Sequence, residues 1–373
     1  MQAYRSARKI VTVIGARPQF IKASAVSARL RTTEHLDEVV IHTGQHFDAN
    51  MSDVFFAELD MAPPKHACAI HGGRHGDMTG RMLIEIEKLL LAEQPDAVLV
   101  YGDTNSTLAG ALAAVKLHIP VAHVEAGLRS FNPRSPEEIN RTLTDRIARW
   151  LFTPNAGAGI HLVREGAAAA SIDQVGDVMY DVTLHHGGRV DPESGVLGAL
   201  RRSHGVQPGS YCLATIHRAE NTDDPVRLAV LVDALTRFSR ELQVVLPLHP
   251  RTRLALARAG HLDALGRALV LIEPQSYLDM VRLEKYAALV ATDSGGVQKE
   301  AFFYHVPCVT FRDETEWVEL VEAGWNRLAP PRDAATVLAQ LQSALGSIGA
   351  EVTPYGKGDA AQRIVQRLCT DLA

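Results

Sequence analysis

The chain alternates short apolar runs with longer segments of helical periodicity along most of its 373 residues. Runs such as Ala97–Tyr101, Tyr211–Thr215 and Leu289–Thr292 are almost continuously apolar, with no alternation between apolar and polar positions. Strands of this kind are buried on both faces, and the helices between them supply the crossovers that parallel pairing requires. The pattern therefore predicts an α/β fold built on parallel sheets.

The length of the chain exceeds what one compact core of typical size accommodates. The alternation weakens between Val178 and Gly209 and then resumes. We therefore predict two Rossmann-like domains and a C-terminal helical segment, over residues 1–180, 205–355 and 356–373. Ligands bind beyond the carboxyl ends of parallel strands, so we expect the two sheets to face a central cleft.

Charge and cysteine usage exclude several classes of protein. With 38 Lys and Arg against 43 Asp and Glu, the formal net charge is −5, which argues against a nucleic-acid or membrane-surface partner. The four cysteines form no CxxC pair, which argues against a zinc site or a disulfide framework and favours a reducing cytosol. No apolar run approaches the ~20 residues of a membrane span. We expect a cytoplasmic protein that binds any phosphate through a few placed groups.

The clearest local motif is TDSGGVQKE, Thr292–Glu300, which directly follows an expected strand. Glycines allow close approach of the backbone, and free amides at a helix start favour an anion. Glu300, one turn into the helix, is placed to accept hydrogen bonds from a ribose diol. The alternative is an ordinary strand–turn–helix in which Asp293 or Ser294 is the N-cap. The motif favours a nucleotide.

The first strand, Lys9–Ile14, ends in GARPQFIK, which lacks the GxGxxG fingerprint of dinucleotide-binding proteins. We therefore expect no NAD and no other cofactor. Arg17 and Lys22 either reach one phosphate together or are solvated surface charges.

Acidic residues follow two further strands. Asp103 lies just past Ala97–Tyr101, and Glu125 ends the run Val121–Glu125. A carboxylate at the end of a buried strand is costly unless it has a partner. Glu137 and Glu138 start the next helix, where complementing the helix dipole suffices to explain Glu138. Asp103, Glu125 and Glu137 are thus candidates for an acid/base set.

Histidines and arginines follow the strands of the second half. His217 and Arg218 follow Tyr211–Thr215, and His249, Arg251 and Arg253 follow Val244–Leu248. A histidine at a strand end is often only a satisfied polar residue, but two at equivalent positions with arginines fit anion recognition better. The 16 histidines show no metal-ligand spacing, so we expect no metal.

These motifs together resemble the non-hydrolysing UDP-N-acetylglucosamine 2-epimerase family. The resemblance runs in order through GARPQFIK, YGDTNSTLAG, HVEAGLRS, PEEINRTLTD, IHRAEN, LPLHPRTR and TDSGGVQKEAFF. It implies a GT-B-like fold and an isomerase that expels UDP to form a 2-acetamidoglucal and then adds UDP back after protonation of the opposite face of C2. It also implies a homodimer.

The resemblance assigns residue roles on matching positions. The implied catalytic residues are Asp103, Glu125, Glu137, His217 and Lys22. The implied UDP-binding residues are Arg17, Arg141, His249, Ser294, Gly295, Gly296, Glu300 and Arg312. The first reading of the substrate is UDP-N-acetylglucosamine, for surface polysaccharide or lipopolysaccharide precursors.

Two stretches, QHFDANMSDVFF and HRAENTDDP, look more like the branch acting on UDP-2,3-diacetamido-2,3-dideoxy-glucuronate in O-antigen synthesis. Arginines from Arg129 to Arg134 are candidates to meet the carboxylate of that sugar. Gln45–Met51 borders the position of an allosteric UDP-sugar site in bacterial members. Other classes left open are a GT-B glycosyltransferase, a hydrolysing epimerase and a non-catalytic sugar-nucleotide binder.

Overall fold

The computed structural model describes residues 7–45, 56 and 58–373. The chain forms two compact units: unit 1 comprises Met1–Leu184 with Thr353–Ala373, and unit 2 comprises His185–Val352. Within the described ranges, no helix is both long enough and apolar enough to cross a membrane. Of the stretch Gln45–Met51, all but Gln45 lies outside the described residues.

Unit 1 contains a seven-stranded, all-parallel sheet in the order β3-β2-β1-β4-β5-β6-β7. Its strands are β1 (Arg8–Ile14), β2 (Leu36–His42), β3 (His66–Ala67), β4 (Ala97–Tyr101), β5 (Val121–Val124), β6 (Trp150–Thr153) and β7 (Ile172–Gln174). Its helices are α1 (Arg17–Arg31), α3 (His75–Glu93), α4 (Asn105–Lys116), α5 (Pro136–Ile147), α6 (Ala156–Arg164), the 3-10 turn η1 (Ala169–Ser171), α7 (Val178–Gly187) and α17 (Ala360–Leu372).

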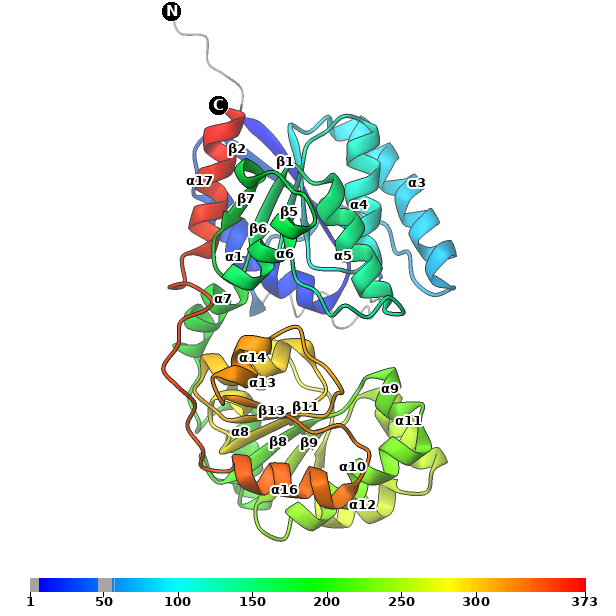
Figure 1. Cartoon of the computed structure of the whole chain (residues 1–373), viewed down its shortest axis with the longest axis vertical. Helices are drawn as coiled ribbons and strands as arrows, with labels where there is room; N and C mark the ends of the chain where they lie inside the picture. Colours follow the sequence, from blue (N-terminus) through cyan, green and yellow to red (C-terminus); the bar gives the residue numbers. More distant parts are fainter. Residues whose placement is uncertain (1–6, 46–55, 57) are drawn as a thin grey trace, which may run out of the picture. The chain divides into compact units, whose positions relative to one another are not determined.

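Helices cover both faces of this sheet, as the apolar strands require. Val11 and Val13 of β1 belong to a buried cluster with residues of α3 and α4. On the other face, the Thr12 hydroxyl and α1 Ser27 both donate to the half-buried Glu38 carboxyl group. The C-terminal helix α17 packs beside α1 (Figure 1). The chain end thereby completes the first unit.

Unit 2 contains a six-stranded parallel sheet in the order β10-β9-β8-β11-β12-β13. Its strands are β8 (Tyr211–Thr215), β9 (Gln243–Pro247), β10 (Val270–Ile272), β11 (Leu289–Thr292), β12 (Cys308–Thr310) and β13 (Asn326–Leu328). Its helices are α8 (Gly195–His204), α9 (Ala219–Thr222), α10 (Pro225–Phe238), α11 (Pro250–Arg258), α12 (Leu262–Ala268), α13 (Tyr277–Lys285), α14 (Gly295–Phe303), α15 (Val318–Glu322) and α16 (Ala334–Ala344).

Successive residues of β8 point to opposite faces of the second sheet. Cys212 and Ala214 join a cluster with α10 and α16, whereas Tyr211 and Leu213 join another with α8 and α13. A strand in which both sets are apolar must be covered on both sides. Unit 2 is therefore a second three-layer α/β unit.

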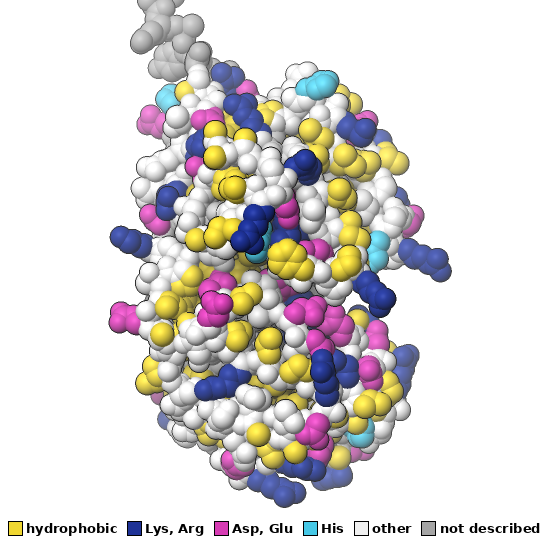
Figure 2. Space-filling model, viewed as in Figure 1, with side chains coloured by type: hydrophobic (Ala, Val, Ile, Leu, Met, Phe, Trp, Pro, Cys, Tyr) yellow, Lys and Arg dark blue, Asp and Glu magenta, His cyan; other side chains and the backbone are white. Residues whose placement is uncertain are grey.

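The predicted α/β class with parallel sheets is confirmed. β4, β8 and β11 have the predicted bounds. The apolar run Val39–Thr43 predicts a strand that begins at Val39, but β2 begins three residues earlier, at Leu36. The segment expected to separate the domains, 178–209, folds as α7 and α8, and the change of unit falls after Leu184. Figure 2 shows basic and acidic side chains interspersed over the face in view, in keeping with the small net charge.

Candidate active site

In unit 1 the strand order reverses between β1 and β4, which is where ligands bind in sheets of this kind. Gln19, in the first turn of α1, joins the two strand ends. Its side-chain oxygen accepts from the Gly15 and Ala16 amides at 2.8 and 3.0 Å, and its nitrogen donates to the Tyr101 carbonyl at 2.9 Å. Only an amide provides both functions at this position, because a carboxylate has no N–H to donate.

Gly15 is required where β1 ends. An added Cβ would lie 2.0 Å from Thr43 Oγ1 and 2.3 Å from Ser106 Oγ. These two hydroxyls are buried and hydrogen-bonded to each other at 2.8 Å, so they have little room to move. The single glycine of the first loop therefore allows the ends of β1 and β2 to approach the start of α4.

Glu125 follows β5 and has the partner that its burial demands. Lys22 Nζ lies 2.6 Å from Glu125 Oε1, and the two side chains are 12% and 7% exposed. Glu125 adopts φ = 70°, a left-handed conformation that costs a non-glycine residue roughly 1–3 kcal/mol and often marks a functional site. The sequence therefore predicted the need for a partner correctly, and the cation comes from α1.

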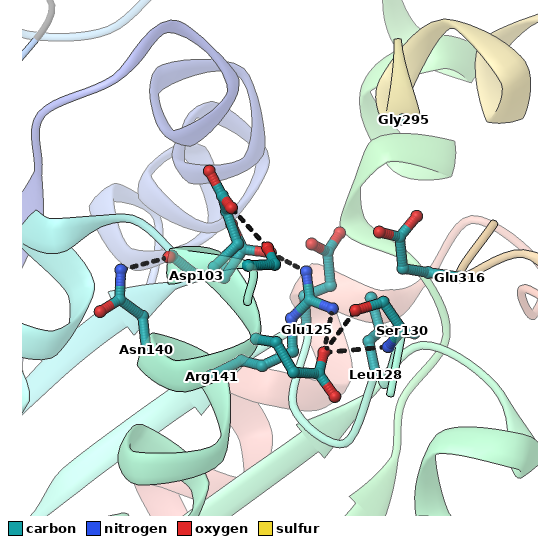
Figure 3. A network of polar contacts seen from close by, with 12 residues as sticks. Asp103, Glu125, Leu128, Ser130, Asn140, Arg141, Gly295 and Glu316 are labelled. Atoms are coloured by element: carbon teal, nitrogen blue, oxygen red, sulfur yellow. Dashed lines mark hydrogen bonds and ion pairs between the residues drawn. The ribbon is translucent and has the colours of Figure 1, made fainter. Parts of the chain in front are cut away.

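Asp103 leaves the sheet next to Glu125, because Tyr101 of β4 pairs with Val124 of β5. The Asp103 carboxylate accepts from Arg141 of α5, and its backbone carbonyl accepts from Asn140 at 2.9 Å (Figure 3). Two carboxyl groups, each paired with a cation, therefore lie at adjacent strand ends. Such a pair provides groups that hold or release protons and cations that attract a phosphate.

The glutamates that start α5 differ in a way that the sequence analysis did not predict. Glu138 is buried, accepts from the Ser130 amide at 2.9 Å and bonds Arg141 Nη1 at 2.8 Å. Glu138 therefore does more than complement the helix dipole, because its carboxylate joins Arg141 to the loop after β5. Glu137 is exposed and accepts from the Ser135 hydroxyl at 2.6 Å, so its place beside Asp103 and Glu125 stays a prediction.

Arg129 does not have the role suggested for it. Its guanidinium is buried, donates to Asp145 at 2.7 Å and binds both carboxylate oxygens of Glu165 at 2.7 and 2.5 Å. A side chain with these partners is not available to a substrate carboxylate. Arg134 is exposed and stays a candidate, and Arg17, half-buried, begins α1.

In unit 2 the strand order reverses between β8 and β11, where Asp293 organises the residues after β8. Its fully buried carboxylate accepts from the His217 and Arg218 amides, each at 3.1 Å, and from Asn221 Nδ2 at 3.0 Å. His217 Nδ1 lies 3.4 Å from Asp293 Oδ1. The local sequence indicates only a helix cap at Asp293, because the partners of this carboxylate lie more than 70 residues away.

His217 and His249 lie side by side, as their places after neighbouring strands predicted. Their ring centroids are 5.9 Å apart. His249 caps α11 by accepting from the Arg251 amide at 3.2 Å. Arg251 and Arg253 form exposed ion pairs with Asp223 and Glu273, so their predicted part in anion recognition stays open.

The SGG motif forms the start of α14. Ser294 is its N-cap, as one reading of the sequence predicted. A Cβ added at Gly295 would meet no atom within 4 Å, and one at Gly296 would lie 3.8 Å from Glu300 Oε2. The space beside Gly295 is therefore open, and the buried Glu300 carboxylate lies next to the first turn. This arrangement suits an anion with a neighbouring diol.

Two further cations of unit 2, Arg312 and Lys299, are buried beside partners. The buried guanidinium of Arg312 donates twice to Glu316, at 2.9 and 3.0 Å, and this pairing outweighs desolvation and raises the pKa of Arg312. Lys299 is buried with Nζ 3.9 Å from the centroid of the Trp317 ring, a cation–π contact. Neither Glu316 nor Lys299 was predicted as a site residue from the sequence. Across the described part of the chain, no group of three or more His, Cys, Asp or Glu side chains is arranged to hold a metal ion.

Comparison with known proteins bears directly on this arrangement. The family model described as UDP-N-acetylglucosamine 2-epimerase matches residues 28–369. A Pseudomonas aeruginosa protein named UDP-2,3-diacetamido-2,3-dideoxy-D-glucuronate 2-epimerase is 52% identical over 368 residues, which cover 96% of this chain and 99% of that protein.

Solved structures agree over the same span. The crystal structure of Methanocaldococcus jannaschii UDP-GlcNAc 2-epimerase, in complex with UDP-GlcNAc and UDP, superposes with a TM-score of 0.89 at 42% identity and covers 97% of this chain and 99% of that one. The Neisseria meningitidis enzyme bound to UDP-GlcNAc gives 0.86 at 28% identity and covers 97% and 100%. The similarity includes both units.

Proposed function

Because this chain belongs to the UDP-N-acetylglucosamine 2-epimerase family, we propose that it inverts C2 of a UDP-2-acetamido sugar. The observation that carries the proposal is the pair of carboxyl groups, Asp103 and Glu125, at adjacent strand ends, each bonded to a cation. Inversion at C2 requires removal of a proton from one face and its return to the other. A single acid/base group on one side does not accomplish both steps.

The C2 proton is not acidic while the anomeric carbon is a glycosyl phosphate. In the proposed reaction a base takes the C2 proton, the C–H electron pair forms the C1–C2 double bond, and the C1–O bond breaks toward the β-phosphate. UDP and a 2-acetamidoglucal result. Protonation of the other face of C2 and return of the UDP oxygen to C1 reverse the sequence. Acid/base groups of this kind give ~10²–10⁴-fold in rate.

The residue roles follow the family resemblance and stay proposals. The proposed catalytic residues are Lys22, Asp103, Glu125, Glu137 and His217. The proposed UDP ligands are Arg17, Arg141, His249, Ser294, Gly295, Gly296, Glu300 and Arg312. The open space beside Gly295 supports the diphosphate assignment, and the position of Glu300 beside the first turn of α14 supports a bond to the ribose diol.

The identity of 52% to the P. aeruginosa protein favours the UDP-2,3-diacetamido uronate as the substrate. UDP-N-acetylglucosamine is the second candidate, because the M. jannaschii enzyme, at 42% identity, was solved with it. The two sugars share the 2-acetamido group and the UDP leaving group, so the same chemistry serves both.

Incubation of each sugar nucleotide with the enzyme in D2O tests the proposal. We expect deuterium at C2 of both epimers and no free sugar, with a higher kcat/KM for the uronate. Sugar transfer to an acceptor without C2 exchange would identify a glycosyltransferase instead. Release of free N-acetylmannosamine would identify a hydrolysing epimerase.

A homodimer is also part of the proposal, on the strength of the family resemblance. Light scattering at micromolar protein is expected to give twice the chain mass of 40.5 kDa, and a mass equal to one chain would remove this part. The cytoplasmic location expected from the sequence stays a prediction.

A further inference from the structure

A network of four titratable side chains, three of them buried, lies behind the strand ends of unit 1. His123 of β5 is fully buried, with Nδ1 2.7 Å from Asp145 Oδ1 and Nε2 2.7 Å from the Gly102 carbonyl oxygen. Asp145 Oδ2 accepts from Arg129 at 2.7 Å, and Arg129 binds Glu165. None of these four residues has a part in the proposed reaction.

The partners of the imidazole determine its protonation. The Gly102 carbonyl has no proton to donate, so Nε2 must donate to it. Asp145 Oδ2 accepts from both the Arg129 guanidinium and the Gly127 amide, contacts that favour the carboxylate. With an acceptor on each side of the ring, both Nδ1 and Nε2 are placed to donate.

The network connects the three segments that carry the candidate site. His123 bonds Gly102, the residue before Asp103. Asp145 accepts from the Gly127 amide at 3.1 Å, in the loop after Glu125. Asp145 also belongs to α5, one turn beyond Arg141, the partner of Asp103. The two turn residues that this network holds, Gly102 and Gly127, are left-handed, with φ of 62° and 82°.

We propose that His123 is a positioning residue, which holds Asp103 and Glu125 in their reactive arrangement by donating from both ring nitrogens, to the Gly102 carbonyl and to Asp145. This inference rests on the proposed function. It adds to it a group that does not touch the sugar, and it predicts that the bond to Gly102 matters more for turnover than the bond to Asp145.

Two substitutions separate the two bonds. The side-chain amide of glutamine reaches the position of Nε2, so His123→Gln keeps a donor for Gly102. The amide of asparagine reaches the position of Nδ1, so His123→Asn keeps a donor for Asp145 only. We expect His123→Asn to lower kcat about 100-fold and His123→Gln less than about 10-fold, because small displacements of reacting groups have effects of this size. The Kd for UDP should stay within about threefold in both.

Trp150→Phe is the matched control for a destabilising change in the same sheet. Its indole N–H donates to Asp371 at 2.7 Å, and Trp150 is buried as deeply as His123. We expect the control to lower the unfolding temperature while kcat per folded molecule stays at the wild-type value. Equal losses of kcat in both His123 variants, or losses that only follow the folded fraction, would overturn the proposal.

Nitrogen-15 NMR of histidine-labelled wild-type protein tests the network without any assay of activity. His123 is expected to show two slowly exchanging ring N–H signals, assigned by through-space correlations to its neighbours in the wild-type protein. A single ring N–H would overturn the proposal, even if the variants fail to fold. If the wild type shows no exchange at C2, the proposed function fails, and the ring signals still decide whether the network is protonated as inferred.

Discussion

Removal of the Lys22 charge is the sharpest test of how unit 1 holds its acidic group. Nζ lies 2.6 Å from Glu125 Oε1, and both side chains are mostly buried. With an effective dielectric constant of about 20, their Coulomb attraction is about 6 kcal/mol, part of which offsets the desolvation of both groups. Lys22→Met leaves the carboxylate buried without this cation. We expect the free energy of unfolding to fall by about 3 kcal/mol at neutral pH.

The loss of stability depends on the ionisation of Glu125, so the deficit of Lys22→Met should grow as the pH rises. Without Lys22, the folded state binds a proton at Glu125 more tightly than the unfolded chain does, where Glu titrates near pH ~4.3. A group whose pKa is higher in the folded state stabilises the fold fully below its pKa in the unfolded chain, and this stabilisation is lost as the pH rises through its folded pKa. The deficit of Lys22→Met is therefore expected to shrink below about 1 kcal/mol near pH 4 and to be complete near neutral pH.

Urea denaturation followed by tryptophan fluorescence measures the effect. Trp150 is the only tryptophan of unit 1, so a Trp317→Phe, Trp325→Phe background isolates its signal. The matched control is Lys22→Met with Glu125→Gln, which we expect to recover about 2 kcal/mol because no buried charge remains. A deficit below about 0.5 kcal/mol at neutral pH, or one that is equal at both pH values, would refute the reasoning.

Three further predictions concern other features of the two units. Gly15→Ala is expected to lower the free energy of unfolding by about 1–3 kcal/mol, because its Cβ would overlap Thr43 Oγ1. Gly295→Ala is the control and should leave the free energy of unfolding unchanged. Urea denaturation of both variants measures the difference, and equal stabilities would contradict the prediction. Glu300→Ala is expected to raise the Kd for UDP at least about 10-fold in calorimetry but to leave that for 2′,3′-dideoxy-UDP unchanged, and equal losses for both nucleotides would exclude a bond to the ribose diol. Burial raises the pKa of Asp181 to about 6, so its contribution to stability is complete below the pKa of the unfolded chain and is lost as the pH rises through about 6. Between pH ~4 and pH ~7 the wild type should lose about 2 kcal/mol more than Asp181→Asn, and parallel pH profiles from urea denaturation would show that this carboxyl group is not perturbed.

The sequence predicted the strands well, because burial on both faces leaves a continuous apolar run. It predicted the start of β2 three residues late, since Asp37 and Glu38 do not look like strand residues. Glu38 is nevertheless half-buried, and its carboxyl group accepts hydrogen bonds from Thr12 and Ser27. These partners come from other elements, so a local pattern does not reveal that they stabilise an acidic residue within the strand.

The same reason explains which site residues sequence reasoning found and which it missed. Strand ends predicted that Asp103 and Glu125 lie together, since parallel strands deliver their following residues to one edge. The acidic partners of these site residues, such as Glu138, Asp293 and Glu316, have no distinctive position in the sequence. Their importance comes from burial beside a cation or an amide, which only the fold creates.

The breaking of the bond between the sugar and UDP is the central chemical claim. It is tested most directly with substrate carrying oxygen-18 in the bridge between C1 and the β-phosphorus. If UDP departs and rejoins C1, the label is expected to scramble into the non-bridging β-phosphate positions of recovered substrate as epimerisation proceeds, which mass spectrometry and phosphorus NMR detect. Complete epimerisation with the label still in the bridge would contradict the account.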